Sequence, residues 1–280
     1  MPAVSATSRA LAELIPATIR PRAEVFESWG SYATGAFADF AAAGLPGTER
    51  ELVSRMDSKF SLPRHHLEDV AHALRRGYAA LAARGTVEAT YVTVYFDTPD
   101  GQLLRDHLRG RRPRSKLRIR HYVDRGISML EVKTRMPSGR TVKLRWPVAF
   151  GSFSPTAGEW LAAAANVHDD LAAVAWTACR RVTLLSRERV ERLTLDIDVL
   201  LGSPWGVRSL GAQVIAELKQ PHVDRESPAW SALRGIGARH GGFSKFVAAM
   251  TLTHPDSTTA RRALRRSSFA GDAPWRVRAG

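Results

Sequence analysis

Charged and apolar side chains alternate along several short segments of this chain. In the run from Arg114 to Arg120, an Arg or Lys stands at every second position, with Leu117 and Ile119 among the residues between them. Because successive side chains of a β-strand point to opposite faces, this segment would form a strand with a cationic face and an apolar face. Several such strands together predict a cationic surface or cavity with an anionic partner.

The same spacing recurs along the middle of the chain. Strands are predicted at about 52–62, 91–97, 114–122, 128–135, 141–148, 181–186, 192–199 and 213–219. Their shared charged face carries the cations Arg55, Lys59, Arg114, Lys116, Arg118, Arg120, Lys133, Arg135, Lys143, Arg145, Arg181, Arg192 and Lys219. The acids on that face are Asp57, Glu131, Asp196, Asp198 and Glu217.

Eight strands are enough to close a barrel. If the charges lie inside, the apolar faces point outward and must be covered by helices. Helices are predicted at 63–84, 154–179 and 228–236, where apolar residues recur at helical spacing. The fold class expected is therefore α+β, with a charged lumen and flanking helices outside.

The ends of the chain differ in composition from its middle. Residues 1–46 are predicted to form a mobile arm with a short helix near 24–40. The main domain is predicted over 47–255, and residues 256–280 read as a disordered basic tail.

The net charge of the chain indicates which class of partner it binds. The chain has 41 Lys and Arg against 27 Asp and Glu, a net charge of +14, which favours polyanions such as nucleic acid, polyphosphate, nucleotides or an anionic membrane surface. The single cysteine, Cys179, excludes an intramolecular disulfide and a cysteine zinc cluster, and its apolar neighbours predict that it is buried. We find no signal peptide and no apolar run of the ~18 residues that a membrane helix needs. We therefore expect a cytoplasmic protein, peripheral at a membrane only through a partner protein or lipid charge.

The chemistry of the charged face has two interpretations at this point. The acids either pair with neighbouring cations or hold Mg²⁺ or Mn²⁺, hard cations that prefer carboxylate and phosphate oxygens. A metal together with Arg and Lys is what phosphoryl transfer requires. Other chemistries lack their motifs: there is no Walker-type loop, no His-Glu-x-x-His and no Gly-x-Ser-x-Gly elbow. His65 and His66 are expected to be exposed at a helix start.

In the order and spacing of its charged motifs, the chain resembles the VTC domain (vacuolar transporter chaperone). This domain is the polyphosphate polymerase branch of the triphosphate tunnel metalloenzymes, also called the CYTH superfamily. The resemblance covers about residues 50–250. It rests on Arg55-x-Asp57-x-Lys59-Phe60, Tyr95-Phe96-Asp97-Thr98, Arg114-x-Lys116-x-Arg118-x-Arg120-x-Tyr122, Leu130-Glu131-Val132-Lys133, Lys143-x-Arg145, Arg192-x-Thr194-x-Asp196, Glu217-x-Lys219 and Phe243-Ser244-Lys245-Phe246.

The resemblance implies an eight-stranded antiparallel β-barrel tunnel that binds a triphosphate or polyphosphate with a divalent metal. It implies phosphate contacts from Lys59, Arg118, Arg120, Lys133, Lys143, Arg181, Arg192 and Lys245, the first five as catalytic residues. We expect further phosphate contacts from Arg55, Arg114, Lys116, Arg145 and Lys219. Glu217 is the implied ligand of Mn²⁺ or Mg²⁺, with Glu131 and Asp196 as helpers.

The chain also departs from the family pattern. Relatives commonly carry Glu at the position of Asp57, and the two-glutamate signature of the wider superfamily is absent. The segment Cys179-Arg180-Arg181 stands where Tyr-x-Arg is usual, and strand parity favours Arg181 as the residue in the lumen.

The leading functional hypothesis is synthesis of polyphosphate from ATP, with ADP as the leaving product. The alternatives are an inorganic or nucleoside triphosphatase and a non-catalytic polyphosphate or nucleotide binder. A specific nucleic-acid partner is disfavoured, because the cations are interleaved with acids and the aromatic residues do not line one charged face.

Overall fold

The computed structural model describes residues 4–27, 29, 35–43, 56–82, 85–152 and 171–253. The cation Arg55 and the predicted basic tail lie outside the described residues. The α-helices are α1 (Ala6–Glu13), α2 (Leu67–Leu74), α3 (Gln102–Arg109), α5 (Pro228–Gly235) and α6 (Lys245–Leu252). None of the described helices is long and apolar enough to cross a membrane.

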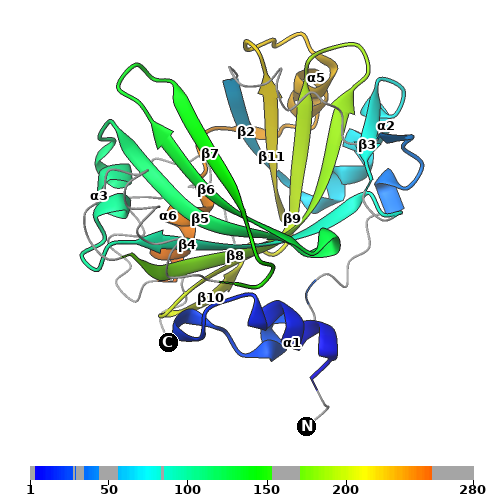
Figure 1. Ribbon diagram of the computed structural model, residues 1–280. Helices are drawn as coiled ribbons and strands as arrows, with labels where there is room; N and C mark the ends of the chain where they lie inside the picture. The colour runs from blue at the N-terminus through cyan, green and yellow to red at the C-terminus, as the bar shows by residue number, and fades with distance from the viewer. Residues whose placement is uncertain are drawn as a thin grey trace, which may run out of the picture.

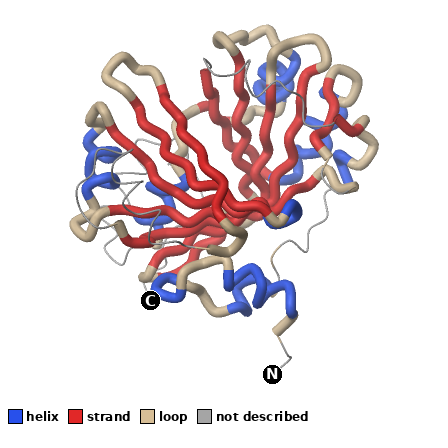
Figure 2. Tube along the Cα trace, viewed as in Figure 1, coloured by secondary structure: helices blue, strands red, loops and turns tan. Residues whose placement is uncertain are grey.

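Twelve strands form one sheet in the described part of the chain (Figures 1 and 2). They are β1 (Ala42–Ala43), β2 (Met56–Pro63), β3 (Tyr78–Leu81), β4 (Glu88–Asp97), β5 (Arg114–Tyr122), β6 (Ile127–Arg135), β7 (Thr141–Val148), β8 (Ala172–Ser186), β9 (Arg192–Ser203), β10 (Gly206–Ser209), β11 (Gln213–Gln220) and β12 (Arg239–His240). The main path of the sheet is β12-β2-β11-β9-β8-β4-β5-β6-β7, with antiparallel neighbours.

The sheet is curved but not closed, so the predicted eight-stranded barrel is wrong in this respect. Within the described residues the end strands β7 and β12 are not paired with each other. The curvature nevertheless brings the two halves together through side chains, because Lys133 Nζ on β6 lies 3.5 Å from Asp57 Oδ2 on β2. The antiparallel architecture and the charged concave face are as expected.

Most strands lie close to their predicted positions, and β5 and β7 coincide with them. The predicted helix over 154–179 is wrong at its end, because residues 172–179 belong to β8; residues 153–170 lie outside the described part. In this stretch Ala175 packs on the concave side of the sheet and Trp176 on the convex side. Both faces are buried, which removes the alternation that identifies a strand.

The predicted helix over 63–84 is also too long. The helix α2 ends at Leu74, and Tyr78 begins strand β3, where it pairs with Ser186 of β8. Val70, Leu74 and Tyr78 nevertheless belong to one core cluster. Apolar residues therefore keep the spacing of a helix beyond its end at Leu74, because the strand that follows the turn packs on the same core. The predicted helix over 228–236 is confirmed as α5.

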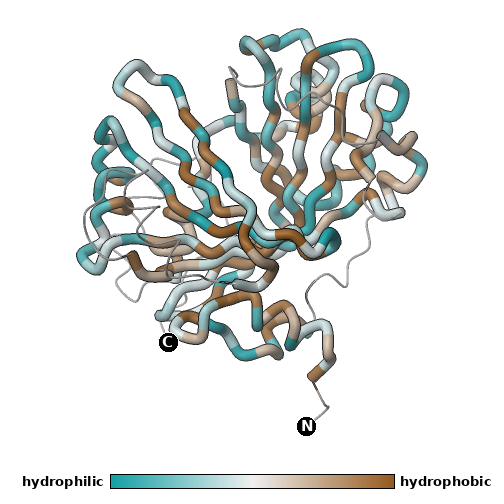
Figure 3. The backbone as a smooth tube through the Cα atoms, viewed as in Figure 1, coloured by the Kyte–Doolittle hydropathy of each residue, from teal (hydrophilic) through white to brown (hydrophobic). Residues whose placement is uncertain are grey.

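Helices cover the convex face of the sheet. Leu74 of α2 and Leu233 of α5 pack against Phe60, Leu195 and Leu218 from the convex faces of β2, β9 and β11. Leu103 of α3 packs against the same side of β5 and β6. Bands of hydrophilic and hydrophobic residues alternate along these strands (Figure 3). The apolar faces are thus on the outside of the curve, as predicted.

The N-terminal segment packs on this convex face as well. Its α-helix lies at Ala6–Glu13, and Ile15 and Phe26 are buried against Trp176 of β8. A Cβ at Gly202 of β9 would come within 2.1 Å of the Trp176 ring, so only glycine leaves room for this indole. The helix expected near 24–40 is not found in the described residues of that range, which form 3₁₀ turns at 23–26 and 35–37. Burial of apolar side chains holds the segment in place.

Helix α6 lies on the concave face and closes off part of the lumen. Phe246 stacks on Tyr95 of β4, with ring centroids 5.3 Å apart. Ala249 packs in the same cluster with Cys179 of β8 and Val199 of β9. Cys179 is buried, as predicted. The helix therefore covers part of the concave face with apolar side chains, and the charged side chains occupy the rest of that face.

A β-bulge in β9 changes the face on which Asp198 lies. Ala178 of β8 pairs with Leu200, whereas Arg180 pairs with Ile197, so β9 carries one extra residue between them. Asp198 has a φ of 50°, a left-handed conformation that Asp tolerates better than most residues. The prediction that Asp198 shares the charged face with Asp196 is therefore wrong.

Candidate functional site

The cations of β5, β6 and β7 stand in rows that cross the concave face. Lys116, Lys133 and Lys143 are in register on the three strands and form one row. The adjacent row contains Arg118, Glu131 and Arg145, and the row on the other side of the lysines pairs Arg114 with Arg135. Antiparallel pairing places side chains of the same parity opposite each other, so the alternating sequence produces these rows directly.

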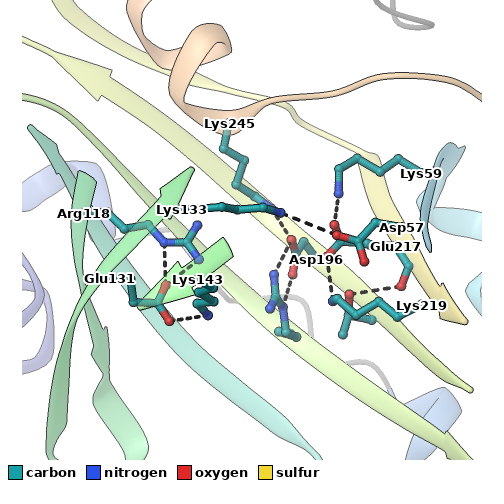
Figure 4. A network of polar contacts seen from close by, with 12 residues as sticks. Asp57, Lys59, Arg118, Glu131, Lys133, Lys143, Asp196, Glu217, Lys219 and Lys245 are labelled. Carbon is teal, nitrogen blue, oxygen red and sulfur yellow. Dashed lines mark hydrogen bonds and ion pairs between the residues drawn. The ribbon is translucent and has the colours of Figure 1, made fainter. Parts of the chain in front are cut away.

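Glu131 is at the centre of the first cluster (Figure 4). It is fully buried and accepts from Arg118 Nε at 2.6 Å and from Arg145 Nε at 3.0 Å. Lys143 Nζ lies 2.6 Å from the same carboxylate. Burial alone would raise the pKa of Glu131, but the charges of Arg118 and Arg120 outweigh it and hold the pKa well below its usual range.

A second cluster joins β8, β9 and α6. Arg181 donates to Asp196 through Nε at 2.5 Å and Nη2 at 2.8 Å, and Lys245 contacts the same carboxylate. Burial opposes ionisation of Asp196, but the charges of Arg181 and Lys245 outweigh it and lower the pKa of this acid strongly. The parity argument that placed Arg181 in the lumen is confirmed, since Arg180 lies on the convex side with Asp198.

A third cluster joins β2 and β11. Glu217 pairs with Lys59 across the two strands, and Lys219 Nζ lies 2.6 Å from its second oxygen. Asp57 stands on β2 opposite Lys219 and pairs with Lys133 at 3.5 Å from across the lumen. Burial and the nearby charges of Lys219 and Lys133 lower the pKa of Lys59 well below its usual value. In this cluster lysines hold the carboxylates, whereas in each of the other two clusters at least one arginine joins a lysine at the carboxylate.

An aromatic residue organises two of the arginines. The guanidinium of Arg181 lies 5.0 Å from the centroid of the Tyr91 ring, and that of Arg120 lies 5.6 Å from it. Arg120 also donates to Thr93 Oγ1 at 3.3 Å. Tyr91 and Thr93 come from β4, between the strands that carry the arginines. The sequence analysis did not identify Tyr91 or Thr93 as site residues. Both stand at alternate positions with Tyr95 in the predicted strand 91–97, and this spacing was the available signal that they share a face.

Within the described residues, Lys116 forms no ion pair with a carboxylate. Its Nζ donates to Ser244 Oγ at 3.0 Å, and Ser244 is the N-cap of α6. Burial, assisted by the charges of Lys133 and Arg118, lowers the pKa of Lys116 from 10.5 to about 7. The protein itself therefore stabilises the charge of this lysine only weakly.

The structure locates every predicted phosphate contact except Arg55, which is outside the described residues. Arg192 of β9 is in register with Lys219 of β11, at one end of the third cluster. The three predicted metal ligands Glu131, Asp196 and Glu217 do not meet, because each is the centre of a different cluster. No group of three or more His, Cys, Asp or Glu that could hold a metal occurs in the described part of the chain.

This arrangement still fits a metal that is bound partly by phosphate. Mg²⁺ is commonly held by one or two carboxylates plus substrate phosphate oxygens, and a cage made only of protein ligands is not needed. Glu131 and Asp196 are committed to arginine pairs in buried positions. Glu217, which has Asp57 on the neighbouring strand, pairs with Lys59 and Lys219, and lysines can turn towards phosphate.

Comparison with known protein families identifies most of this chain. A model of the VTC domain family matches residues 54–254. Among solved structures, a putative adenylyl cyclase from Hippeastrum, described as having a dominant triphosphatase activity, is 18% identical, with a TM-score of 0.46 over 70% of this chain and 94% of its own. A putative adenylate cyclase from Bacillus halodurans is 15% identical, with a TM-score of 0.42 over 66% of this chain and 91% of its own. A search of curated protein sequences gives no match.

Proposed function

We propose that this chain, which belongs to the VTC domain family, transfers phosphoryl groups on a triphosphate or polyphosphate bound along its concave face, and that it makes polyphosphate from ATP. The observation that carries the proposal is the set of cation rows on β5, β6 and β7, which are in register and face the acid clusters of β9 and β11. Such rows suit a linear polyanion.

The residues of the site have distinct proposed roles. Lys116, Lys133 and Lys143 neutralise phosphate oxygens as point charges, while Arg118 and Arg120 grip them with planar guanidinium groups. These groups hold the attacking and leaving oxygens in line and stabilise the charge on the transferred group.

Glu217, with Asp57 beside it, is the proposed holder of Mn²⁺ or Mg²⁺. The metal would supply charge neutralisation of the phosphates when bound. Lys59 and Lys219 hold the Glu217 carboxylate in the lumen through ion pairs. Arg181 and Lys245 are placed by Asp196 so that their remaining donors can reach a phosphate.

A non-catalytic polyphosphate or nucleotide binder is the second candidate. It is favoured by one observation: each of the lumen acids Asp57, Glu131, Asp196 and Glu217 is already paired with at least one cation. In that case the acids would serve only to keep the cations in position.

The test is to incubate the pure protein with ATP and Mn²⁺ and to analyse the products by gel electrophoresis and by ADP release. Polymer together with ADP supports the synthesis of polyphosphate. Release of orthophosphate without polymer would identify a triphosphatase, and tight ATP binding without turnover would identify a binder. A protein that neither binds nor converts ATP, triphosphate or polyphosphate would contradict the whole proposal.

A further inference from the structure

A group of exposed arginines lies at one edge of the lumen. Arg112 is in the loop between α3 and β5, and Arg135 and Arg140 are in the β6–β7 hairpin. We call Arg112, Arg135 and Arg140 the arginine rim. All of them are exposed, and within the described residues none forms an ion pair with a carboxylate, unlike the neighbouring Arg105 and Arg111.

The two segments of the rim lie side by side. A Cβ at Gly139, in the turn of the hairpin, would stand 3.8 Å from Arg112 Nη1. Arg114 is in register with Arg135 on the first strand of the hairpin, and its Nη1 donates to the Arg111 carbonyl at 3.0 Å. Figure 1 shows α3 and the β6–β7 hairpin at the same edge of the sheet. The rim is therefore one surface and not two separate patches.

The rim continues the cation rows of the lumen. The row of Arg114 and Arg135 is next to the row of Lys116 and Lys133. Two residues along a strand correspond to about 7 Å, so successive rows are about that far apart. Like charges placed directly opposite each other destabilise a sheet. The two rows follow each other along β5 and β6, and Asp57 of β2 reaches Lys133 from across the lumen. Within the described residues Arg114, Lys116 and Arg135 form no ion pair with a carboxylate, so this path carries positive charge that a bound anion would neutralise.

The shape of this path favours one class of polyanion. A triphosphate can contact only neighbouring rows, whereas a longer phosphate chain lying in the lumen would extend over the rim. Nucleic acid would be expected to use aromatic platforms for its bases. The loop 110–113 and the turn 136–140 contain no aromatic residue. The unpaired charges therefore suit a chain of phosphates without bases.

We propose that the arginine rim, together with Arg114, is an outer subsite that holds phosphate units of a polyphosphate chain beyond those bound in the lumen. The inference rests on the proposed function, because it extends the same anion path. It identifies the ligand of the whole site as a chain longer than triphosphate.

The test compares the binding of triphosphate and of long-chain polyphosphate to the full chain by isothermal titration calorimetry at fixed salt. The variant is Arg112→Ala/Arg135→Ala, and the control is Arg208→Ala, an exposed arginine of β10. We expect the affinity for long-chain polyphosphate to fall about tenfold in the double variant, as the loss of two charged contacts implies, and the affinity for triphosphate to change less than about twofold. The control should change neither.

Several outcomes would overturn the subsite. One is an unchanged affinity for the long chain in the double variant; another is an equal loss for triphosphate or in Arg208→Ala, which would indicate only a general effect of net charge. Equal competition by a single-stranded DNA oligonucleotide for the rim would assign it to nucleic acid instead. If the unaltered protein binds neither phosphate ligand, the proposed function itself fails, and this result is distinguishable from failure of the rim alone.

Discussion

Arg181 and Asp196 face each other across β8 and β9 and are joined by two hydrogen bonds, with Nε to Oδ1 at 2.5 Å and Nη2 to Oδ2 at 2.8 Å. Lys245 brings α6 to the same carboxylate. One acid therefore ties two strands in the middle of the sheet to the helix on its concave face. Because Arg181 is also a proposed phosphate contact, we expect stability and binding to depend on the same pair.

Asp196→Ala should destabilise the fold, because it leaves Arg181 as an uncompensated buried charge. We expect the free energy of unfolding, measured by urea denaturation, to fall by about 3–5 kcal/mol. Asp69→Ala is the matched control, since Asp69 forms an exposed pair with His66 and should cost at most about 1 kcal/mol. Equal losses in the two variants would contradict the role of Asp196.

Glu217→Gln should separate turnover from binding. The change removes the proposed metal ligand but keeps the shape of the side chain, so we expect activity with ATP and Mn²⁺ to fall at least about 100-fold. Binding of triphosphate without metal should persist, because the loss of a negative charge does not weaken an anion site. Calorimetry with EDTA present checks the binding, and full activity in this variant would exclude Glu217 as the ligand.

The affinity for triphosphate should decrease between pH 6 and pH 8. Burial and neighbouring cations lower the pKa of Lys116 to about 7, so this lysine is mostly charged at pH 6 and mostly neutral at pH 8. An anion favours the charged form, and binding near neutral pH should therefore take up protons. Calorimetry in buffers of different ionisation enthalpy measures this uptake.

The matched control for this pH dependence is Lys116→Arg, in which the guanidinium stays charged over the whole range. Its affinity should depend less on pH than that of the unaltered protein. The same lowered pKa affects folding with a definite sign: from 10.5 down to about 7 the unfolded chain binds a proton that the folded chain does not. The contribution of Lys116 to stability should therefore become less favourable as the pH falls through this window, and level off below it. Identical pH profiles for the two proteins would contradict the assignment to Lys116.

Tyr91 should position Arg120 and Arg181 through its ring and not through its hydroxyl. Tyr91→Phe keeps the aromatic face and should leave the KM for the phosphate substrate unchanged. Tyr91→Leu removes two cation–π contacts, each worth about 0.5–2 kcal/mol, and should raise KM several-fold. A change in kcat alone, or the same loss in both variants, would contradict a positioning role.

Asp198→Ala should weaken the fold without weakening the site. Asp198 pairs with Arg64 and with Arg180 on the convex face and has a left-handed φ of 50°. We expect a loss of about 2–4 kcal/mol in thermal or urea unfolding, and a smaller loss for Asp198→Asn, which tolerates this conformation. Below the melting temperature, the KM of Asp198→Ala should match that of the unaltered protein. A raised KM would indicate that the bulge acts on the lumen.

The alternation of residues predicted most of the sheet correctly because it depends only on strand geometry. The segments Arg114–Tyr122 and Thr141–Val148 are strands as expected, and their cations share one face. The same reasoning failed around residue 175, where α1 and α6 bury both faces of β8. It failed again at Asp198, because a bulge inserts one residue and reverses the parity that follows. In both places a tertiary contact or an irregularity replaced the local pattern.

The sequence by itself determined that the chain forms strands with one charged and one apolar face, and that helices must cover the apolar side. Those properties follow from side-chain spacing and from the cost of exposing apolar surface. Only the tertiary structure decided which acid meets which cations, that Glu131, Asp196 and Glu217 belong to separate clusters, and that the sheet remains open between β7 and β12 in the described residues. These features depend on strand order and register, which bring together residues far apart in the chain and which no local pattern specifies.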